Sequence, residues 1–116
     1  MRLATSCRED TAEAIAESVT ELLAEFHRRN GCGPASVRMA IFTATPDLRS
    51  AKPARAARQA GWAHVPMLCL AEMPTVDDFP RCIRVLVILE RNENAGLARP
   101  VYLNGTQALR PDLETD

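Results

Sequence analysis

Residues 82–89 read Cys-Ile-Arg-Val-Leu-Val-Ile-Leu, an apolar run that Arg84 alone interrupts. Eight residues rich in valine, isoleucine and leucine predict a buried β-strand. An arginine buried without a partner costs on the order of several kcal/mol. We therefore expect Arg84 to have a partner, which is either a carboxylate of the protein or an anionic ligand. The strand pattern alone leaves both possibilities open.

The segments around this strand alternate between strand and helix patterns. Apolar residues recur at helical spacing from Ile15 to Phe26, after two possible capping boxes, and Gly31 ends this predicted helix. Pro53 suits the start of a short helix that Gly61 ends. The capping boxes are residues 6–9 and 10–13, the short helix is 54–60, a turn is expected at 92–96, and the other predicted strands are 2–5, 37–44, 65–71 and 100–103.

The order β-α-β-α-β-β-β predicts the α/β class, with a mixed β-sheet and helices on one face. The length of 116 residues indicates one domain, residues 1–116, and 47% apolar residues are enough for a core. Five short strands leave sheet edges to cover, and oligomerisation is a common way to cover them.

The composition excludes several classes of function. A net charge of −1 gives no reason to expect nucleic acid or an anionic membrane surface as a partner. The four cysteines are widely spaced and the two histidines lie far apart, so we expect no metal site. No signal peptide and no apolar span of about 20 residues is found, which fits a reduced cytoplasmic setting.

The basic residues are unusual in kind, because thirteen are arginine and only Lys52 is lysine. A GC-rich genome explains such a bias as a whole, although it does not explain an arginine inside a strand. Arginine also presents a planar fork that binds carboxylates through two hydrogen bonds. The bias is therefore compatible with an anion site without requiring one.

No nucleotide-binding glycine motif and no serine nucleophile motif is present, and Cys69 has no histidine close in sequence. What remains is charge placed at strand ends: Glu72 ends one apolar strand and Arg84 interrupts another. On spacing alone, these two residues are as readily a structural ion pair as parts of a ligand site. By default, Arg58 and Arg110 are surface charges and Tyr102 is a core aromatic residue.

Residues 43–48, Thr-Ala-Thr-Pro-Asp-Leu, resemble the signature of the monofunctional, AroH-class chorismate mutases. Further matching segments follow in the same order and spacing over nearly the whole chain. They are Pro53-Ala54 with Arg58, Gly61-Trp62, Val65-Pro66, Cys69 with Glu72-Met73, Cys82-Ile83-Arg84, Val101-Tyr102-Leu103 and residues 109–113.

The resemblance implies a homotrimer that forms a pseudo-α/β-barrel, with active sites between subunits. It implies the Claisen rearrangement of chorismate to prephenate in the biosynthesis of phenylalanine and tyrosine, without a covalent intermediate, cofactor or metal. Such a reaction needs a positioned substrate and fixed positive charge where an oxygen becomes negative. The absence of a nucleophile motif agrees with that requirement.

The resemblance also implies a role for each matching residue. Arg84 would donate to the ether oxygen, Glu72 would accept from the ring hydroxyl, and Arg2 would hold a carboxylate. The implied substrate-binding residues are Tyr102, Arg58, Arg110, Cys69, Leu109, Lys52 and Ala54, with Arg58 reaching in from the neighbouring subunit.

The chain departs from the family pattern at three places. Lys52 stands where the family usually has phenylalanine, the loop after Glu72 lacks the usual glycines, and Arg2 lies almost at the terminus, where fraying is expected. These changes keep open a weakened or specialised relative that binds a cyclic dicarboxylate without efficient turnover. Another small-molecule enzyme on a similar trimeric scaffold, such as an imine deaminase, is a further alternative.

Overall fold

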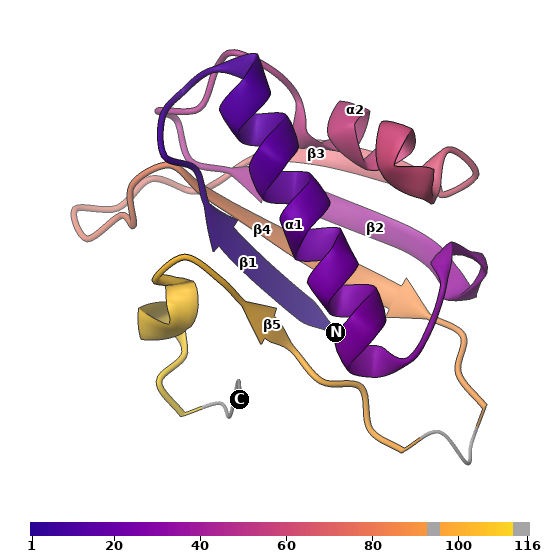
Figure 1. Ribbon diagram of the computed structural model, residues 1–116. Helices are drawn as coiled ribbons and strands as arrows, with labels where there is room; N and C mark the ends of the chain where they lie inside the picture. Colours follow the sequence, from indigo (N-terminus) through magenta and orange to yellow (C-terminus); the bar gives the residue numbers. More distant parts are fainter. Residues whose placement is uncertain (93–95, 113–116) are drawn as a thin grey trace.

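The computed structural model describes residues 1–92 and 96–112, and within them the chain forms one mixed sheet with helices on one face (Figure 1). Most of the turn expected at 92–96, and residue 113 of the tail, lie outside the described residues. The strands are β1 (Arg2–Ser6), β2 (Val37–Ala44), β3 (Met67–Ala71), β4 (Cys82–Leu89) and β5 (Val101–Tyr102).

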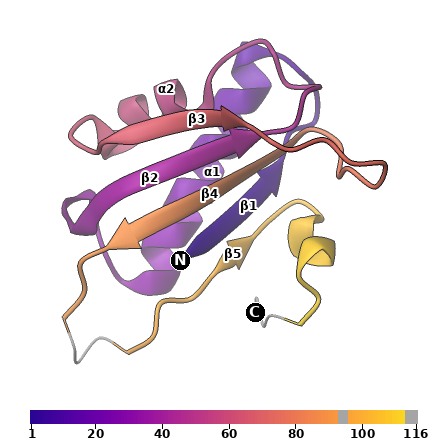
Figure 2. The ribbon, with the colours of Figure 1, turned by 180° about the vertical axis from the view of Figure 1, so that it is seen from behind.

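The sheet has the strand order β3-β2-β4-β1-β5, which Figure 2 shows from behind. β4 lies at its centre and runs antiparallel to both of its neighbours, β2 and β1. The outer strands β3 and β5 run parallel to β2 and β1, respectively. The predicted mixed sheet is therefore confirmed.

Two helical segments cover one face of this sheet. The long helix α1 (Ala12–Asn30) ends at Gly31, whose φ of 58° is the left-handed conformation that glycine adopts readily. The short helix α2 (Pro53–Ala57) begins with proline, as predicted, and continues into a wider turn over Arg58–Trp62. Short 3₁₀ turns occupy Pro34–Ser36 and Thr106–Leu109.

Neither predicted capping box forms the N-terminus of α1. The capping residue is Thr11, whose hydroxyl accepts a hydrogen bond from the backbone N–H of Ala14 at 3.1 Å. Asp10 has a different task, because its carboxylate accepts hydrogen bonds from the backbone N–H groups of Arg49 and Ser50. It thereby holds the loop before α2 against the start of α1.

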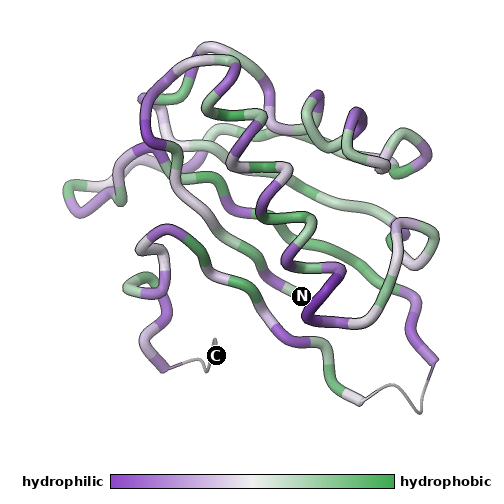
Figure 3. The backbone as a smooth tube through the Cα atoms, viewed as in Figure 1, coloured by the Kyte–Doolittle hydropathy of each residue, from purple (hydrophilic) through white to green (hydrophobic). Residues whose placement is uncertain are grey.

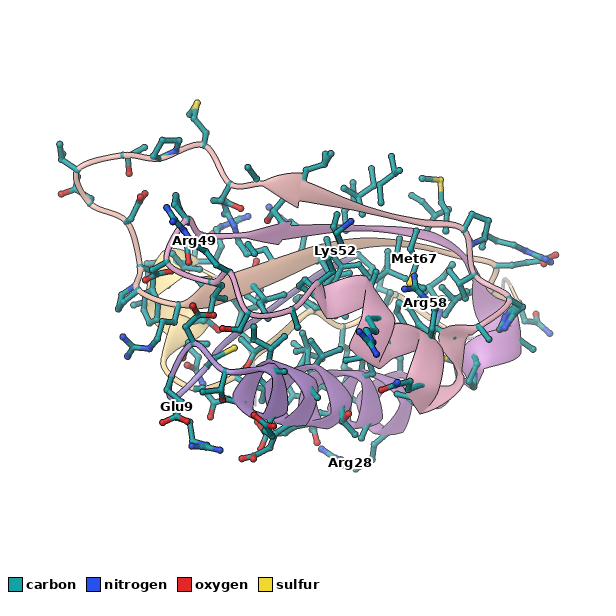
Figure 4. The ribbon with its side chains drawn as sticks, turned by 90° about the horizontal axis from the view of Figure 1, so that it is seen from above. Glu9, Arg28, Arg49, Lys52, Arg58 and Met67 are labelled. Atoms are coloured by element: carbon teal, nitrogen blue, oxygen red, sulfur yellow. The ribbon has the colours of Figure 1, made fainter. Side chains whose placement is uncertain are left out.

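The core lies between α1, α2 and the covered face of the sheet. The apolar stripe of α1 is fully buried there, as its helical spacing predicts, together with Trp62 from the end of the α2 segment. Figure 3 shows polar and apolar segments alternating along α1, and Figure 4 shows both helices on the same side of the sheet. The buried stripe consists of Ile15, Val19, Leu22, Leu23 and Phe26.

The other face of the sheet has no helix over it in the described residues, and this corrects the expectation that β4 is buried on both faces. Cys82, Ile83, Val85 and Val87 are buried, whereas the residues between them are exposed. Leu86 and Ile88 are each 45% exposed, and on β3 Leu68 is 60% and Leu70 50% exposed. We call this surface the open face. No helix in the described part of the chain is long and apolar enough to cross a membrane.

Candidate active site

Arg84 projects from β4 onto the open face, where its side chain is 51% exposed. The prediction that it is buried in an apolar strand is therefore wrong for the single chain, because side chains alternate between the two faces of a strand. The prediction of a partner is confirmed, since Arg84 forms an ion pair with Glu72. In the chain alone, that partner is a carboxylate of the protein.

Glu72 follows directly after β3, and its side chain is only 14% exposed. Its backbone N–H donates to the carbonyl of Ala44 at 2.9 Å, which extends the pairing of β3 with β2 beyond the strand. Because β2 lies between β3 and β4, the ion pair bridges two strands that are not neighbours. The Glu72 carboxylate is thus a largely buried acceptor beside a half-exposed guanidinium.

A cavity of about 310 Å³ surrounds this ion pair on the open face, a volume at the low end for small-ligand pockets. Arg2 reaches it from the first residue of β1, Tyr102 from β5 and Arg110 from the segment after the last 3₁₀ turn. The cavity thus combines three arginines, one carboxylate and one phenol. A second cavity beside it also contacts Glu72 and Arg84, and Leu109 lines its wall.

Arg110 also has a carboxylate partner within the chain. Its guanidinium donates to both carboxylate oxygens of Asp112, from Nε at 3.0 Å and from Nη2 at 2.7 Å. These bonds lower the pKa of the Asp112 carboxyl from 3.8 to about 2. The fork of Arg110 is therefore already in the geometry that receives a carboxylate.

The first strand, where fraying is expected, is paired from its first residue. Arg2 is paired in register with Leu86, and the carbonyl of Met1 accepts a hydrogen bond from the backbone N–H of Val87 at 2.9 Å. The ladder therefore extends to the first residue and holds Arg2 against β4.

The segment Thr45–Asp47 fixes the start of β4 and hence the position of Arg84. The Thr45 hydroxyl donates to the Asp47 carboxylate at 2.5 Å and accepts from the backbone N–H of Cys82 at 2.9 Å. The other oxygen of Asp47 accepts from the backbone N–H of Arg81 at 2.9 Å. Arg81 has a φ of 47°, a conformation that costs a non-glycine residue free energy and is held here by these contacts.

The described cysteines and histidines form no metal cluster, and two of the four cysteines are buried thiols. Among the described residues, no group of three or more metal-ligating side chains is placed to hold a metal ion. Cys7 and Cys82 are buried free thiols, and burial raises the pKa of Cys82 to about 11. Such a thiol remains protonated at neutral pH and is a poor nucleophile.

The known proteins that are similar to this chain share one named activity. The family model described as "Chorismate mutase type I" matches residues 1–113. Chorismate mutase AroH of Thermus thermophilus is 42% identical over 116 residues, with 99% of this chain and 95% of that protein covered. The Bacillus subtilis protein of the same name is 36% identical, with 97% and 90% covered.

The chain belongs to the type I chorismate mutase family. The solved structure of a chorismate mutase from Clostridium thermocellum also matches, with a TM-score of 0.84 and 33% identity. It covers 93% of this chain and 96% of the solved one, so the shared fold extends over almost the whole molecule.

Four of the residues matched to the type I chorismate mutase pattern lie away from the cavity around Arg84. Lys52 and Arg58 line a separate cavity between α1 and α2, and Figure 4 shows both on the side of the sheet where the helices lie. Ala54 is buried within α2. Cys69 is in register with Phe42, so it faces the core and not the open face.

Sequence reasoning missed one residue of the cavity, Thr43 of β2, which lies directly opposite Arg84 in the sheet register. The signal for it was available. Alternation along β2 places Thr43 on the same face as Met39 and Ile41, where it is the polar residue at the end of an apolar series.

Proposed function

We propose that this chain is an isomerase that converts chorismate to prephenate by a Claisen rearrangement. The observation that carries the proposal is the arrangement of Arg84 and Glu72 around one cavity with Arg2, Tyr102 and Arg110, in a chain of the type I chorismate mutase family. The reaction breaks a C–O bond and forms a C–C bond within one molecule. It needs no nucleophile, and its barrier falls when the substrate is held compactly and the developing charge is stabilised.

Arg84 supplies the charge that this transition state needs. As the C–O bond breaks, negative charge grows on the ether oxygen, and a guanidinium N–H aimed at that oxygen stabilises the transition state more than the substrate. With 51% of its side chain exposed in the free chain, Arg84 can turn from Glu72 toward an incoming ligand. Glu72 then accepts a hydrogen bond from the ring hydroxyl of the substrate.

The remaining arginines bind the substrate's two carboxylates. Arg2 and Arg110 approach the cavity from opposite ends of the chain, and Tyr102 adds a hydrogen-bonding phenol between them. Leu109 supplies an apolar wall on the side of the second cavity. Bidentate pairing with two carboxylates orients the molecule as well as binding it.

The proposed assembly is a homotrimer with active sites between subunits. The open face exposes four large apolar residues of β3 and β4. Association with another subunit through this face would remove their apolar surface from water, which is favourable. Lys52, Ala54 and Arg58 lie on the far side of the same chain, so they reach a site only when a neighbouring subunit presents them. Cys69 faces the core, three residues before Glu72 along the chain.

The proposed setting is the biosynthesis of phenylalanine and tyrosine in the cytoplasm, with residues 1–116 acting as one domain. A relative that binds a cyclic dicarboxylate without efficient turnover is the second candidate, and Lys52 in place of the family's usual phenylalanine favours it. Calorimetric binding of a cyclic dicarboxylate without loss of chorismate would identify that second function.

The test of catalysis follows chorismate absorbance and the appearance of prephenate with purified protein. We expect turnover in the wild type and a fall in kcat of more than about 10³ in Arg84→Lys, because lysine keeps the charge but loses the fork. The matched control is Arg38→Lys, which changes another exposed arginine that is paired with a glutamate, Glu90. Wild-type protein that is folded and inactive would refute the proposal, and an Arg84→Lys kcat near wild type would refute the role of Arg84.

A further inference from the structure

Thr43 lies on β2, between the strand that carries Arg84 and the strand that leads to Glu72. Its register partners are Arg84 on one side and Leu70 on the other. Because side chains alternate along a strand, Glu72 projects from the same face as Leu70, two residues before it. The ion pair between Arg84 and Glu72 therefore runs diagonally across β2, on the face that carries Thr43.

The hydroxyl of Thr43 is buried in the lining of the cavity that also contains Glu72 and Arg84. Its Oγ1 atom has no hydrogen-bond partner within residues 1–92 and 96–112. Two other buried threonines are satisfied, since Thr45 bonds to Cys82 and the Thr106 hydroxyl donates to the Leu103 carbonyl at 2.7 Å. A buried hydroxyl without a hydrogen-bond partner is unfavourable. Its position in the lining of a cavity therefore indicates that it gains a partner when a ligand is bound.

The identity of that partner follows from what substrate binding does to the ion pair, which makes this inference dependent on the proposed function. When Arg84 turns to the ether oxygen, it exchanges the Glu72 carboxylate for an acceptor that becomes negative as the C–O bond breaks. Glu72 has no such replacement, because it loses a cation and gains only a neutral hydroxyl donor while a dianion enters beside it. The group with unmet hydrogen-bonding demand is therefore the Glu72 carboxylate.

We propose that Thr43 is a positioning residue whose hydroxyl donates a hydrogen bond to Glu72 once the substrate has drawn Arg84 away. The bond keeps the carboxylate aimed at the ring hydroxyl, which holds the substrate in its reactive conformer. In the free chain, Glu72 is paired with Arg84, and the Thr43 hydroxyl has no hydrogen-bond partner among the described residues. The substitution of Thr43 should therefore affect the reacting complex and the free protein in opposite directions.

Thr43→Val tests this because valine keeps the shape of threonine and removes only the hydroxyl. We expect kcat to fall about 10- to 100-fold, the range for losing a hydrogen bond to a charged group, with a much smaller change in KM. We expect the Tm of the substrate-free protein to stay the same or to rise, because an unpaired buried hydroxyl has been removed. A role in packing alone cannot lower kcat while sparing Tm.

Two further variants complete the experiment. Thr43→Ser keeps the hydroxyl and should retain most of the wild-type kcat. Thr5→Val removes another buried hydroxyl of the sheet, one that accepts from Asn104 at 2.9 Å, and should lower Tm without the loss of kcat.

Three results would each overturn the inference. The first is a Thr43→Val kcat within twofold of wild type, and the second is a Thr43→Val variant in which both kcat and Tm fall. The third is a Thr43→Ser variant whose kcat is as low as that of Thr43→Val. A wild type without turnover overturns the proposed function itself, and this inference falls with it. The wild-type assay therefore distinguishes the two failures.

Discussion

At the scale of single residues, two arginines of the cavity each hold a carboxylate of their own chain. Arg84 is paired with Glu72, and Arg110 is paired with Asp112 through two hydrogen bonds. In the proposed site, the ligand therefore replaces Asp112 with one of its own carboxylates at Arg110, and it replaces Glu72 with its ether oxygen at Arg84. The exchange at Arg110 costs little, and it discriminates against ligands without a correctly placed carboxylate.

Lys52 is the residue whose contribution departs most from the family pattern. It precedes α2, where its side chain is exposed and makes no capping hydrogen bond. As a flexible point charge presented to a neighbouring subunit's site, it can attract a carboxylate but cannot provide an apolar wall.

We expect Lys52→Ala to raise KM for chorismate about 3- to 10-fold with little change in kcat, because it removes an exposed charge that acts on the substrate and the transition state alike. The measurement is steady-state kinetics at low and high salt, since screening should shrink the difference between Lys52→Ala and wild type. Arg38→Ala, which removes an exposed cation that does not line the cavity of Lys52, is the matched control for a general loss of positive charge. Equal effects of the two substitutions would contradict a specific role for Lys52.

At the scale of elements, those with a clear apolar period were predictable from sequence. The stripe from Ile15 to Phe26, the strand over residues 37–44 and the Pro53 start of α2 all follow from local patterns, and the structure confirms them. The start of α1 was less predictable, because Asp10 and Thr11 both suit a cap and only tertiary contacts assign Asp10 to another loop.

Within the candidate site, the possible pairing of Arg84 with Glu72 was predictable from sequence, and the exposure of Arg84 was not. Arg84 and Glu72 were named correctly as a pair to be explained, yet an apolar run such as residues 82–89 does not reveal whether both faces are covered within one chain. Leu86 and Ile88 are as apolar as the buried Val85 and Val87, and a face that another copy covers, as in the proposed trimer, would have the composition of a core. Sequence periodicity cannot distinguish a strand face that is buried within one chain from a face that another copy would cover.

One hydrogen bond ties α1 to the end of the α2 segment. The indole N–H of Trp62 donates to Nε2 of His27 at 3.0 Å, so the neutral ring carries its proton on Nδ1, 3.8 Å from the sulfur of Cys32. Burial lowers the pKa of His27 below 6.5. Protonation at Nε2 would both break the bond to Trp62 and place a charge among the aromatic rings.

We therefore expect the protein to lose stability as the pH falls below about 6.5. The unfolded chain then binds a proton at His27 that the folded chain resists, so stability rises with pH across this window and is complete above it. Urea unfolding at pH 7.5 and at pH 5.5 measures the change, and His27→Gln should reduce it. His64→Gln, which alters the exposed histidine, should leave the wild-type difference intact, and a loss of the difference in that variant would contradict the assignment to His27.

At the scale of the whole molecule, one face of the sheet is covered by helices and the other is open, which Figure 4 shows from above. The open face carries both the cavity around Arg84 and the exposed leucines of β3. Association through this face would therefore bury apolar surface and complete the site in one step. Stability and activity should then depend on the same interface.

We expect Leu68→Glu to dissociate the proposed trimer, because a carboxylate on an apolar interface is desolvated without a partner. Light scattering coupled to size-exclusion chromatography reports the mass, and the same sample should lose most of its kcat/KM while circular dichroism stays near that of the wild type. Leu97→Glu changes a leucine that is 94% exposed and outside the strands, and it should leave the mass unchanged. A Leu68→Glu protein that remains trimeric and active would show that the interface lies elsewhere.

The strand order has a consequence for how the protein is made on the ribosome. β1 is synthesised first, yet its two neighbours in the sheet, β4 and β5, are synthesised last. The emerging chain can form α1 and pair β2 with β3. β1, however, has no strand partner until the residues of β4, from 82 onward, have left the ribosome. We expect the cavity to form only after Arg110 has been synthesised, and the unpaired β1 to be the segment of the nascent chain most in need of a chaperone.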